Sequence, residues 1–396
     1  MKEWSQRKMI PKQWQNAIDV INQIEQAGFE AFIVGGAVRD YYLKKENNDV
    51  DITTSALPEE IQAIFPHTID VGIAHGTVLV LQQNEPIEVT TYRTESTYTD
   101  HRRPDAVHFV SDLAEDLKRR DFTMNAMALS QTGEFIDLYD GRKHIDERLI
   151  CAVGNAEERF TEDALRMLRA VRFAAQLNFK IEDQTFAAIQ KQASSITLIA
   201  MERIQVELSK IFMSPFPAQG IQSMQESQLA KHLAGEFDEV AWRLFQSDNR
   251  QVGWAYFCLV NQDVTLLTHY RCSNKDKQFV KQVLAAYECL VKGIEKRELL
   301  HFDVEILHTA YQFTQWQQQT IECTWEQLQQ QKLALPIQSA QQLAITGQDL
   351  MAWSHKKRGP WIKDILDAAL QAVVNGDVVN DKQQIKEWFH ATNDEG

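Results

Sequence analysis

Residues 35–53 have the sequence GGAVRDYYLKKENNDVDIT, and we expect the functional site to be built on this stretch, with the rest of the chain serving that site. The four apolar residues before it, 31–34, predict a short buried strand. Gly35 and Gly36 follow directly, and because glycine has no Cβ the backbone can approach a ligand such as a phosphate. Residues 38–45 predict a helix whose N-terminal N–H groups would face the same ligand.

Two carboxylates follow at Asp49 and Asp51. Their alternation with Val50 and Ile52 predicts a strand that carries both acids on one face. Such a pair suits Mg²⁺, which takes carboxylate oxygens and completes its shell with water and substrate phosphates. A two-metal arrangement would steady the attacking and leaving oxygens of a phosphoryl transfer. A D-x-D pair alone is more often a solvated strand edge, so the metal site is favoured by its combination with the glycines and the helix.

GGAVRD followed by DVDI resembles motif A of the polymerase-β-like nucleotidyltransferases, specifically the class II tRNA nucleotidyltransferases and the bacterial poly(A) polymerases. The resemblance implies an α+β fold, in which a catalytic head with a small mixed sheet and helices precedes an all-α neck, body and tail. It also implies that Asp49 and Asp51 are catalytic metal ligands and that the triphosphate is held by Gly35, Gly36 and Arg39.

Residues 77–82 and 87–92 have strand character and are separated by Gln83-Asn84-Glu85-Pro86, a turn composition that predicts a hairpin. Glu88 lies on the second of these strands. The family has a third acidic residue on a neighbouring strand, and Glu88 resembles it, which implies a catalytic role. The alternative is an ordinary exposed glutamate on a strand.

Residues 93–108 are polar and show neither a helical nor a strand period, which predicts a long loop. In the CCA-adding enzymes that the chain resembles, a flexible loop at this place helps to switch nucleotide choice from C to A. The alternative is an unremarkable surface loop in which Arg102 and Arg103 are solvated.

Residues 117–126, LKRRDFTMNA, resemble motif B of the same family, RRDFT-x-NA. Arg120 suits a triphosphate because its guanidinium is always charged and donates in a bidentate fork. Asp121 and Asn125 are placed to orient the arginines or the neighbouring loop. The later segment 137–141 with Asp146 resembles motif C, to which we assign a structural role.

The segment from residue 157 predicts a helix with Thr161 as its N-cap. Asp163, Arg166, Arg169 and Arg172 recur every third residue, so they form a locally contiguous polar row. A carboxylate and guanidiniums offer an acceptor and donors to the edge of a base. The row resembles motif D, which implies that Asp163 and Arg166 pair with the base of CTP or ATP, while Arg169 and Arg172 brace that pair or contact phosphate. The alternative is a charge ladder on a solvated helix.

The remaining sequence is rich in helical patterns. Residues 201–211 resemble motif E, an amphipathic helix that supports the base-reading helix, and the C-terminal segments resemble the tail of Bacillus-type class II enzymes. A basic cluster there either touches tRNA phosphates or forms a solvated face; it contains Lys356, Lys357, Arg358 and Lys363. We predict four parts: a catalytic head over residues 1–148, a base-recognising neck over 149–211, a helical body over 212–300 and a tRNA-binding tail over 301–396.

The chain of 396 residues has a formal net charge of −14, which argues against coating of nucleic acid by bulk electrostatics. No stretch approaches the ~20 apolar residues needed to span a bilayer, so we expect a soluble protein without a membrane partner. The charged N-terminus argues against export. An odd number of widely spaced cysteines favours free thiols in the cytoplasm: Cys151, Cys258, Cys272, Cys289 and Cys323.

The resemblance implies template-independent addition of CCA to the 3′ end of tRNA, including repair of partial ends. CTP and ATP would be the substrates, Mg²⁺ the cofactor and pyrophosphate a product. An A-adding enzyme or a poly(A) polymerase is an alternative with the same chemistry. A non-catalytic tRNA-binding protein is an alternative of another class, which the complete motifs A, B and D oppose. Monomer and homodimer both stay open.

Overall fold

The computed structural model describes residues 10–72, 75–95, 107–354 and 356–393. It divides into two compact units, which are described here one at a time. Unit 1 comprises Met1–Asp248 with His269–Arg271, and unit 2 comprises Asn249–Thr268 with Cys272–Gly396.

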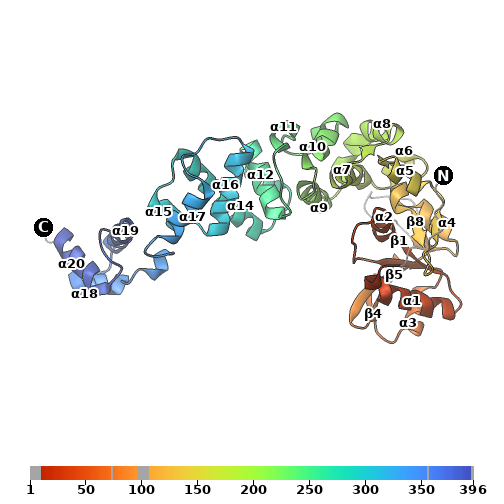
Figure 1. Ribbon diagram of the computed structural model, residues 1–396, viewed down its shortest axis with the longest axis horizontal. Helices are drawn as coiled ribbons and strands as arrows, with labels where there is room; N and C mark the ends of the chain where they lie inside the picture. Colours follow the sequence, from red (N-terminus) through yellow and green to blue (C-terminus); the bar gives the residue numbers. More distant parts are fainter. Residues whose placement is uncertain (1–9, 73–74, 96–106, 355, 394–396) are drawn as a thin grey trace. The chain divides into compact units, whose positions relative to one another are not determined.

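A seven-stranded mixed sheet forms the N-terminal part of unit 1 (Figure 1). Its strand order is β3-β4-β5-β2-β1-β8-β9, with β2 parallel to β5 and the other neighbouring pairs antiparallel. The strands are β1 (Ala31–Val34), β2 (Asp51–Thr54), β3 (Thr68–Gly72), β4 (Thr77–Gln82), β5 (Glu85–Thr91), β8 (Met127–Leu129) and β9 (Phe135–Asp137). The predicted hairpin is confirmed, because β4 and β5 pair directly along the chain.

Two helices cover one face of this sheet, α1 (Gln15–Gln26) and α3 (Pro58–Ile64), and Figure 1 shows them beside β4. The helix α1 buries Val20, Ile21 and Ile24 completely, as expected from their helical spacing. Burial of this face leaves the opposite face of the central strands free to carry polar side chains.

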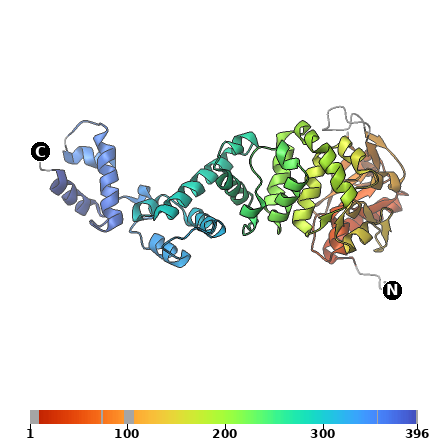
Figure 2. The same cartoon turned by 90° about the horizontal axis from the view of Figure 1, so that it is seen from above.

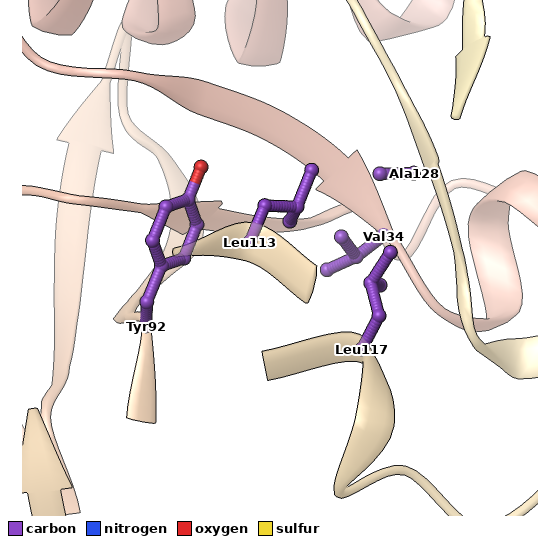
Figure 3. Packing of buried hydrophobic residues seen from close by; sticks show 5 residues of the cluster. All are labelled: Val34, Tyr92, Leu113, Leu117 and Ala128. Atoms are coloured by element: carbon purple, nitrogen blue, oxygen red, sulfur yellow. The ribbon is translucent and has the colours of Figure 1, made fainter. Parts of the chain in front are cut away.

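The opposite face has a small core of its own, which Figure 3 shows in close-up. Val34 and Ala128 point from adjacent strands towards Leu113 and Leu117 of α4 (Leu113–Lys118), and Tyr92 closes the cluster. The helix α4 leads directly into the segment 119–126, so this packing fixes the position of that segment over the sheet.

Residues 93–108 differ from the predicted unbroken loop. The two ends of this segment pair as a two-stranded ribbon of β6 (Arg93–Glu95) and β7 (Val107–Phe109). Strands of three residues are too short to show a period in the sequence, so the pairing could not be recognised. Arg102 and Arg103 lie outside the described residues.

Helices make up most of unit 1 after the sheet, and they are coloured yellow to green in Figure 2. They include α5 (Gly141–Asp146), α6 (Ala156–Glu162), α7 (Leu165–Leu177), α8 (Asp183–Gln192), α9 (Met201–Phe212), α10 (Pro217–Glu226) and α11 (Glu239–Trp242). Here β10 (Leu149–Ile150) pairs in parallel with β11 (Lys180–Ile181), a contact that the sequence did not predict. Both α9 and α10 pack on α7, so α7 is the central helix of this layer.

All regular elements of unit 2 in the described part of the chain are helical. The longer ones are α12 (Arg250–Asn261), α14 (Asn274–Lys292), α16 (Val304–Trp316), α17 (Trp325–Leu333), α18 (Gly347–Ser354), α19 (Trp361–Asn375) and α20 (Lys382–Asn393). The expected fold, a head with a mixed sheet followed by helices, is confirmed. No described helix is long and apolar enough to cross a membrane.

Candidate active site

A polar cavity of about 630 Å³ lies in unit 1 between the sheet, the segment after α4 and the helix α7. It brings together every predicted site residue except Glu88: Gly35, Gly36, Arg39, Asp49, Asp51, Arg120, Asp163, Arg166, Arg169 and Arg172. Residues that lie more than a hundred positions apart in the chain therefore line one space.

The glycine turn forms one wall of this cavity. Gly35 has a φ of +72°, which side chains with a Cβ rarely adopt, and a Cβ there would lie 3.3 Å from Nη1 of Arg120. Gly36 begins α2 (Gly36–Tyr42), two residues earlier than predicted. Because Val34 pairs with Asp51 in the register of β1 and β2, the turn lies beside the first acid of β2.

Asp49, Asp51 and Glu88 form what we call the acidic end of the site. Asp51 is the first residue of β2, whereas Asp49 lies in the segment before it, so the predicted strand over both acids is wrong for Asp49. Burial, and then the nearby negative charges of Glu88 and Asp49, raise the pKa of Asp51 to about 6. Glu88 and Asp49 are therefore both near enough to Asp51 to disfavour its charged form.

Glu88 lies on β5 outside the main cavity. It lines a smaller neighbouring cavity of about 230 Å³, which it shares with Asp49. The parallel register pairs Ile52 of β2 with Val89 of β5. The preceding residues, Asp51 and Glu88, therefore lie next to each other on the other face of the sheet from Ile52 and Val89.

The acidic end suits a hard divalent cation. Within the described residues no three His, Cys, Asp or Glu side chains are gathered closely enough to hold a metal ion by themselves. Magnesium commonly takes only one or two carboxylates and fills its shell with water and substrate phosphates. Asp49 and Asp51 meet that requirement, and a cation between them would offset their repulsion.

Five arginines line the cavity and form what we call the arginine wall: Arg39, Arg120, Arg166, Arg169 and Arg172. A chain of hydrogen bonds joins two of its members through the residues predicted to orient them. Arg39 Nη1 donates to Asn125 Oδ1 at 2.8 Å, and Asn125 Nδ2 donates to Asp121 Oδ1 at 3.1 Å. Arg169 Nε then donates to Asp121 Oδ2 at 2.7 Å. Burial alone would raise the pKa of Asp121, but Arg169, Asn125 and Arg166 together outweigh burial and lower that pKa to about 2.

Asp116 orients Arg120. It is completely buried at the end of α4 and accepts from Arg120 Nη2 at 3.1 Å and from Arg119 Nη2 at 2.8 Å. Burial opposes ionisation of Asp116, but the two arginines outweigh burial and lower its pKa. The sequence did not single out Asp116, which motif B does not include.

Asp163 lies between two helices and not inside one, so the predicted N-cap at Thr161 is wrong. The N-cap of α6 is Asn155, whose side chain accepts from two backbone N–H groups. At Asp163 the chain turns to φ −144° and ψ 102°, and its Oδ1 accepts from Leu165 N at 3.1 Å, which starts α7. A carboxylate that caps a new helix competes with continuation of the old one.

Arg203 of α9 holds Asp163 in a two-pronged ion pair. Its Nη2 and Nη1 donate to Oδ2 and Oδ1 of Asp163 at 2.7 Å and 3.3 Å. Arg203 also lines the cavity. The sequence analysis gave residues 201–211 only a supporting role, because a contact over forty positions leaves no local pattern.

Arg166 and Arg172 are buried members of the arginine wall. Arg166 Nη1 donates to Glu162 Oε2 at 2.6 Å, and its Nη2 donates to the backbone oxygen of Arg119 at 3.0 Å. Arg172 Nε lies 3.2 Å from Glu207 Oε2, an ion pair between two side chains that are both below 10% exposed. The sequence analysis assigned no role of their own to Glu162 and Glu207.

Asn47 connects the two sides of the site. Its Oδ1 accepts from the backbone N–H of Asp49 at 2.8 Å, and its Nδ2 donates to Asp40 at 2.8 Å. Asp40 in turn accepts from Arg39 Nε at 2.9 Å. The sequence analysis assigned no role to Asn47. Its polar side chain and its place within residues 35–53 were the signals that could have pointed to one.

Motif C has the expected structural place. Asp137 accepts from the backbone N–H groups of Gly141 and Arg142 at 2.7 and 3.0 Å, which caps α5. A Cβ on Gly141 would lie 2.4 Å from the backbone oxygen of Thr123, so only glycine lets α5 approach the segment of motif B.

A glycine turn, an acidic end and an arginine wall around one cavity define a nucleotidyltransferase head. Three family models match the chain: the Poly A polymerase head domain at residues 31–151, the "Probable RNA and SrmB- binding site of polymerase A" at 178–240 and tRNA nucleotidyltransferase domain 2 at 245–389. The CCA-adding enzyme of Bacillus cereus (strain G9842) is 40% identical over 96% of this chain and 99% of its own. That of Bacillus anthracis is 39% identical with the same coverage. The chain belongs to the family of CCA-adding enzymes.

Solved structures agree with this assignment. The structure of Bacillus stearothermophilus CCA-adding enzyme in complex with CTP matches with a TM-score of 0.89 and 37% identity, over 97% of this chain and 98% of that one. Thermotoga maritima CCA-adding enzyme complexed with tRNA matches with a TM-score of 0.68 at 19% identity and 97% coverage of both chains, which shows a shared fold. Nucleotidyltransferases of this family generally depend on a divalent metal ion.

Proposed function

We propose that this chain adds CCA to the 3′ end of tRNA without a template, using CTP and ATP, and that it also completes partial CCA ends. The observation that carries the proposal is one cavity lined by both Asp49 and Asp51 and by five arginines. The substrates tRNA, CTP and ATP are inferred from membership of the CCA-adding enzyme family.

In the proposed reaction the terminal hydroxyl of tRNA attacks the α-phosphate of the bound nucleotide. The new bond joins that oxygen to the α-phosphorus, the bond to the β-phosphate breaks, and pyrophosphate leaves. Arg39 and Arg120 hold the triphosphate beside the Gly35 turn. Because Gly35 has no Cβ, the triphosphate can approach the backbone there. Catalysis of this kind rests on positioning and on stabilisation of charge.

Base selection falls to the joint between α6 and α7. Asp163 keeps an acceptor at the cavity and is held there by Arg203, while Arg166 supplies donors from the first turn of α7. Arg169 and Arg172 brace this pair or contact phosphate. An acceptor with adjacent donors can pair with the edge of cytosine or adenine.

We propose Mg²⁺ as the divalent ion, held by Asp49 and Asp51 with Glu88 beside them. When bound, it would neutralise charge on the phosphates and activate the attacking hydroxyl. Removal of divalent ions with a chelator should abolish nucleotide incorporation, and Mg²⁺ added back in excess should restore it. Restoration by Mn²⁺ or Co²⁺ but not by Mg²⁺ would contradict the choice of metal.

One assay tests the function. The protein is incubated with tRNA transcripts that end before CCA, after the first C and after CC, with CTP and ATP supplied separately and together. We expect C, C and A to be added in that order, and extension to stop after A. Addition of a single A to the CC-ended transcript alone would identify an A-adding enzyme. A long A tail would identify a poly(A) polymerase.

We further propose the four-part organisation, action in the cytoplasm, and contact between tRNA and the tail. The five free cysteines are consistent with a reducing compartment. The basic cluster in the tail supports a contact with phosphate: it comprises Lys356, Lys357, Arg358 and Lys363. Exchange of these four residues for glutamine should weaken tRNA binding and flatten its salt dependence, while CTP binding stays unchanged.

A further inference from the structure

The ring of Phe173 has three guanidiniums of the arginine wall around it. The Cζ atoms of Arg172, Arg39 and Arg169 lie 4.2, 5.1 and 5.7 Å from the ring centroid. Arg39 comes from α2, whereas Arg169 and Arg172 come from α7. Phe173 lines the cavity but is only 4% exposed, so its ring lies behind the arginines and not in front of them.

The position of this ring is fixed from behind. Phe122 packs against it edge-on, with centroids 5.8 Å apart and an interplanar angle of 84°. Phe122 is completely buried, and its backbone N–H donates to Asp121 Oδ1 at 2.8 Å. The same aspartate binds Arg169, so the aromatic pair and the arginine share one anchor.

Three like charges in one place repel one another. Burial, and then the charges of Arg169 and Arg39, lower the pKa of Arg172 to about 10, although Glu207 opposes the change. Within the described residues Nε of Arg172 has no hydrogen-bond partner, since its contact with Glu207 lacks the required geometry. The face of an aromatic ring attracts a cation most strongly where water is excluded. The ring of Phe173 therefore attracts Arg172, whose Nε lacks a hydrogen-bond partner among the described residues.

We propose that Phe173 is a positioning residue for nucleotide binding, whose ring holds the guanidiniums of Arg39, Arg169 and Arg172 together against one cavity. The inference rests on the proposed nucleotidyl transfer, and it adds an uncharged residue to a site so far described by charges. Ground-state binding of the triphosphate depends on this arrangement, because an arginine that swings away from the ring also leaves the cavity.

The test compares variants that separate the electronic character of the ring from its bulk. Phe173→Leu keeps apolar bulk but removes the aromatic face, whereas Phe173→Tyr keeps both. We expect Phe173→Leu to raise KM for CTP and for ATP about tenfold with kcat within about twofold, and Phe173→Tyr to stay within about twofold of the parent for both constants. The ratio of the CTP and ATP constants should stay unchanged.

Phe160 offers a matched control. It is 1% exposed on α6 in the same layer, and among the described residues no guanidinium lies over its ring. Phe160→Leu should lower the melting temperature about as much as Phe173→Leu does but leave KM unchanged. Equal effects of the two variants on KM would overturn the inference, since they would show a general loss of packing.

A series of fluorinated phenylalanines at position 173 gives a second readout, because fluorine weakens the negative face of the ring with little change of size. We expect the affinity for CTP, measured by equilibrium binding without tRNA, to fall stepwise with each added fluorine. Constant affinity across the series would also overturn the inference. Binding without tRNA keeps this result separate from the proposed function: a parent chain that binds CTP but extends no transcript would refute the function alone.

Discussion

The acidic end and the arginine wall belong to one site, but they are built in opposite ways. Every arginine of the wall has an acidic or amide partner, such as Asp121 for Arg169 and Asp116 for Arg120. Within the described residues, the side chains of Asp49, Asp51 and Glu88 make no hydrogen bond or ion pair.

The difference indicates which part of the site is complete before substrate arrives. Protein partners orient the arginines of the wall, whereas Asp49, Asp51 and Glu88 have no such partner among the described residues and are the residues proposed to bind a cation. Nucleotide affinity should therefore depend on the wall, and the chemical step on the acidic end.

The largest expected effect follows from removal of an acid. Asp49→Ala should lower nucleotide incorporation about a thousandfold or more, because the charge that gathers in the transition state loses its stabilising ion. The affinity for CTP in the presence of a chelator should stay within about twofold, since the arginine wall is untouched. Rapid-quench assays and equilibrium binding measure the two quantities. Incorporation that survives the exchange would refute the metal assignment.

The wall is tested by removal of its internal partner. Asp121→Asn removes the negative charge that pairs with Arg169 inside the protein. This loss should lower the free energy of unfolding by about 3 kcal/mol and raise KM for both nucleotides. Urea denaturation and initial rates measure these changes. Asp183→Asn is the control, because its ion pair with Lys180 is exposed and should contribute little to stability. Similar losses in both variants would contradict a buried framework.

The clamp on Asp163 is tested by Arg203→Lys, which keeps the charge but loses the two-pronged geometry. We expect KM for CTP and ATP to rise by about three- to tenfold and unequally, because the acceptor that pairs with the base is no longer held. Competition between the two nucleotides measures the discrimination. Arg243→Lys is the control, since Arg243 also makes a two-pronged ion pair, through Nε and Nη2 with Glu239, on an exposed surface. An equal response of CTP and ATP would argue that Arg203 supports the fold only.

The smallest effect is a pH dependence. Folding lowers the pKa of Asp121 from an ordinary value near 3.9 to about 2, so its contribution to stability is present above about pH 4 and is lost as the pH falls towards 2. The difference in unfolding free energy between the parent chain and Asp121→Asn should therefore shrink over this window. Denaturation at pH 6, 4, 3 and 2.5 measures the trend. A difference that stays constant down to pH 2.5 would show that Asp121 is not the titrating group.

Local pattern was sufficient to predict much of this molecule. The strand at residues 31–34 and the β4–β5 hairpin follow from apolar runs and a turn composition. The order of motifs led to the head with its sheet and to helices after it. The cavity then gathers most of the predicted site residues, although their individual roles stay predictions.

Contacts across long stretches of chain explain what the sequence left out. The helix predicted from residue 157 breaks at Asp163, where that side chain accepts from the backbone N–H of Leu165 and binds Arg203 of a distant helix. Phe173 has an ordinary apolar place in its helix, and only the fold brings Arg39 to its ring. Asp49 leaves the predicted strand because Asn47 holds its backbone instead.

The pairing of Val34 with Asp51 has a last consequence, for how this site tolerates change during evolution. Gly35 follows the first of these residues, so the spacing between the glycine turn and Asp51 is set by the ladder of a sheet and not by the intervening chain. Insertions or deletions between Lys44 and Glu46 should therefore be accommodated. A slip of β2 by a single residue would turn Asp51 into the hydrophobic layer under α1 and abolish the site.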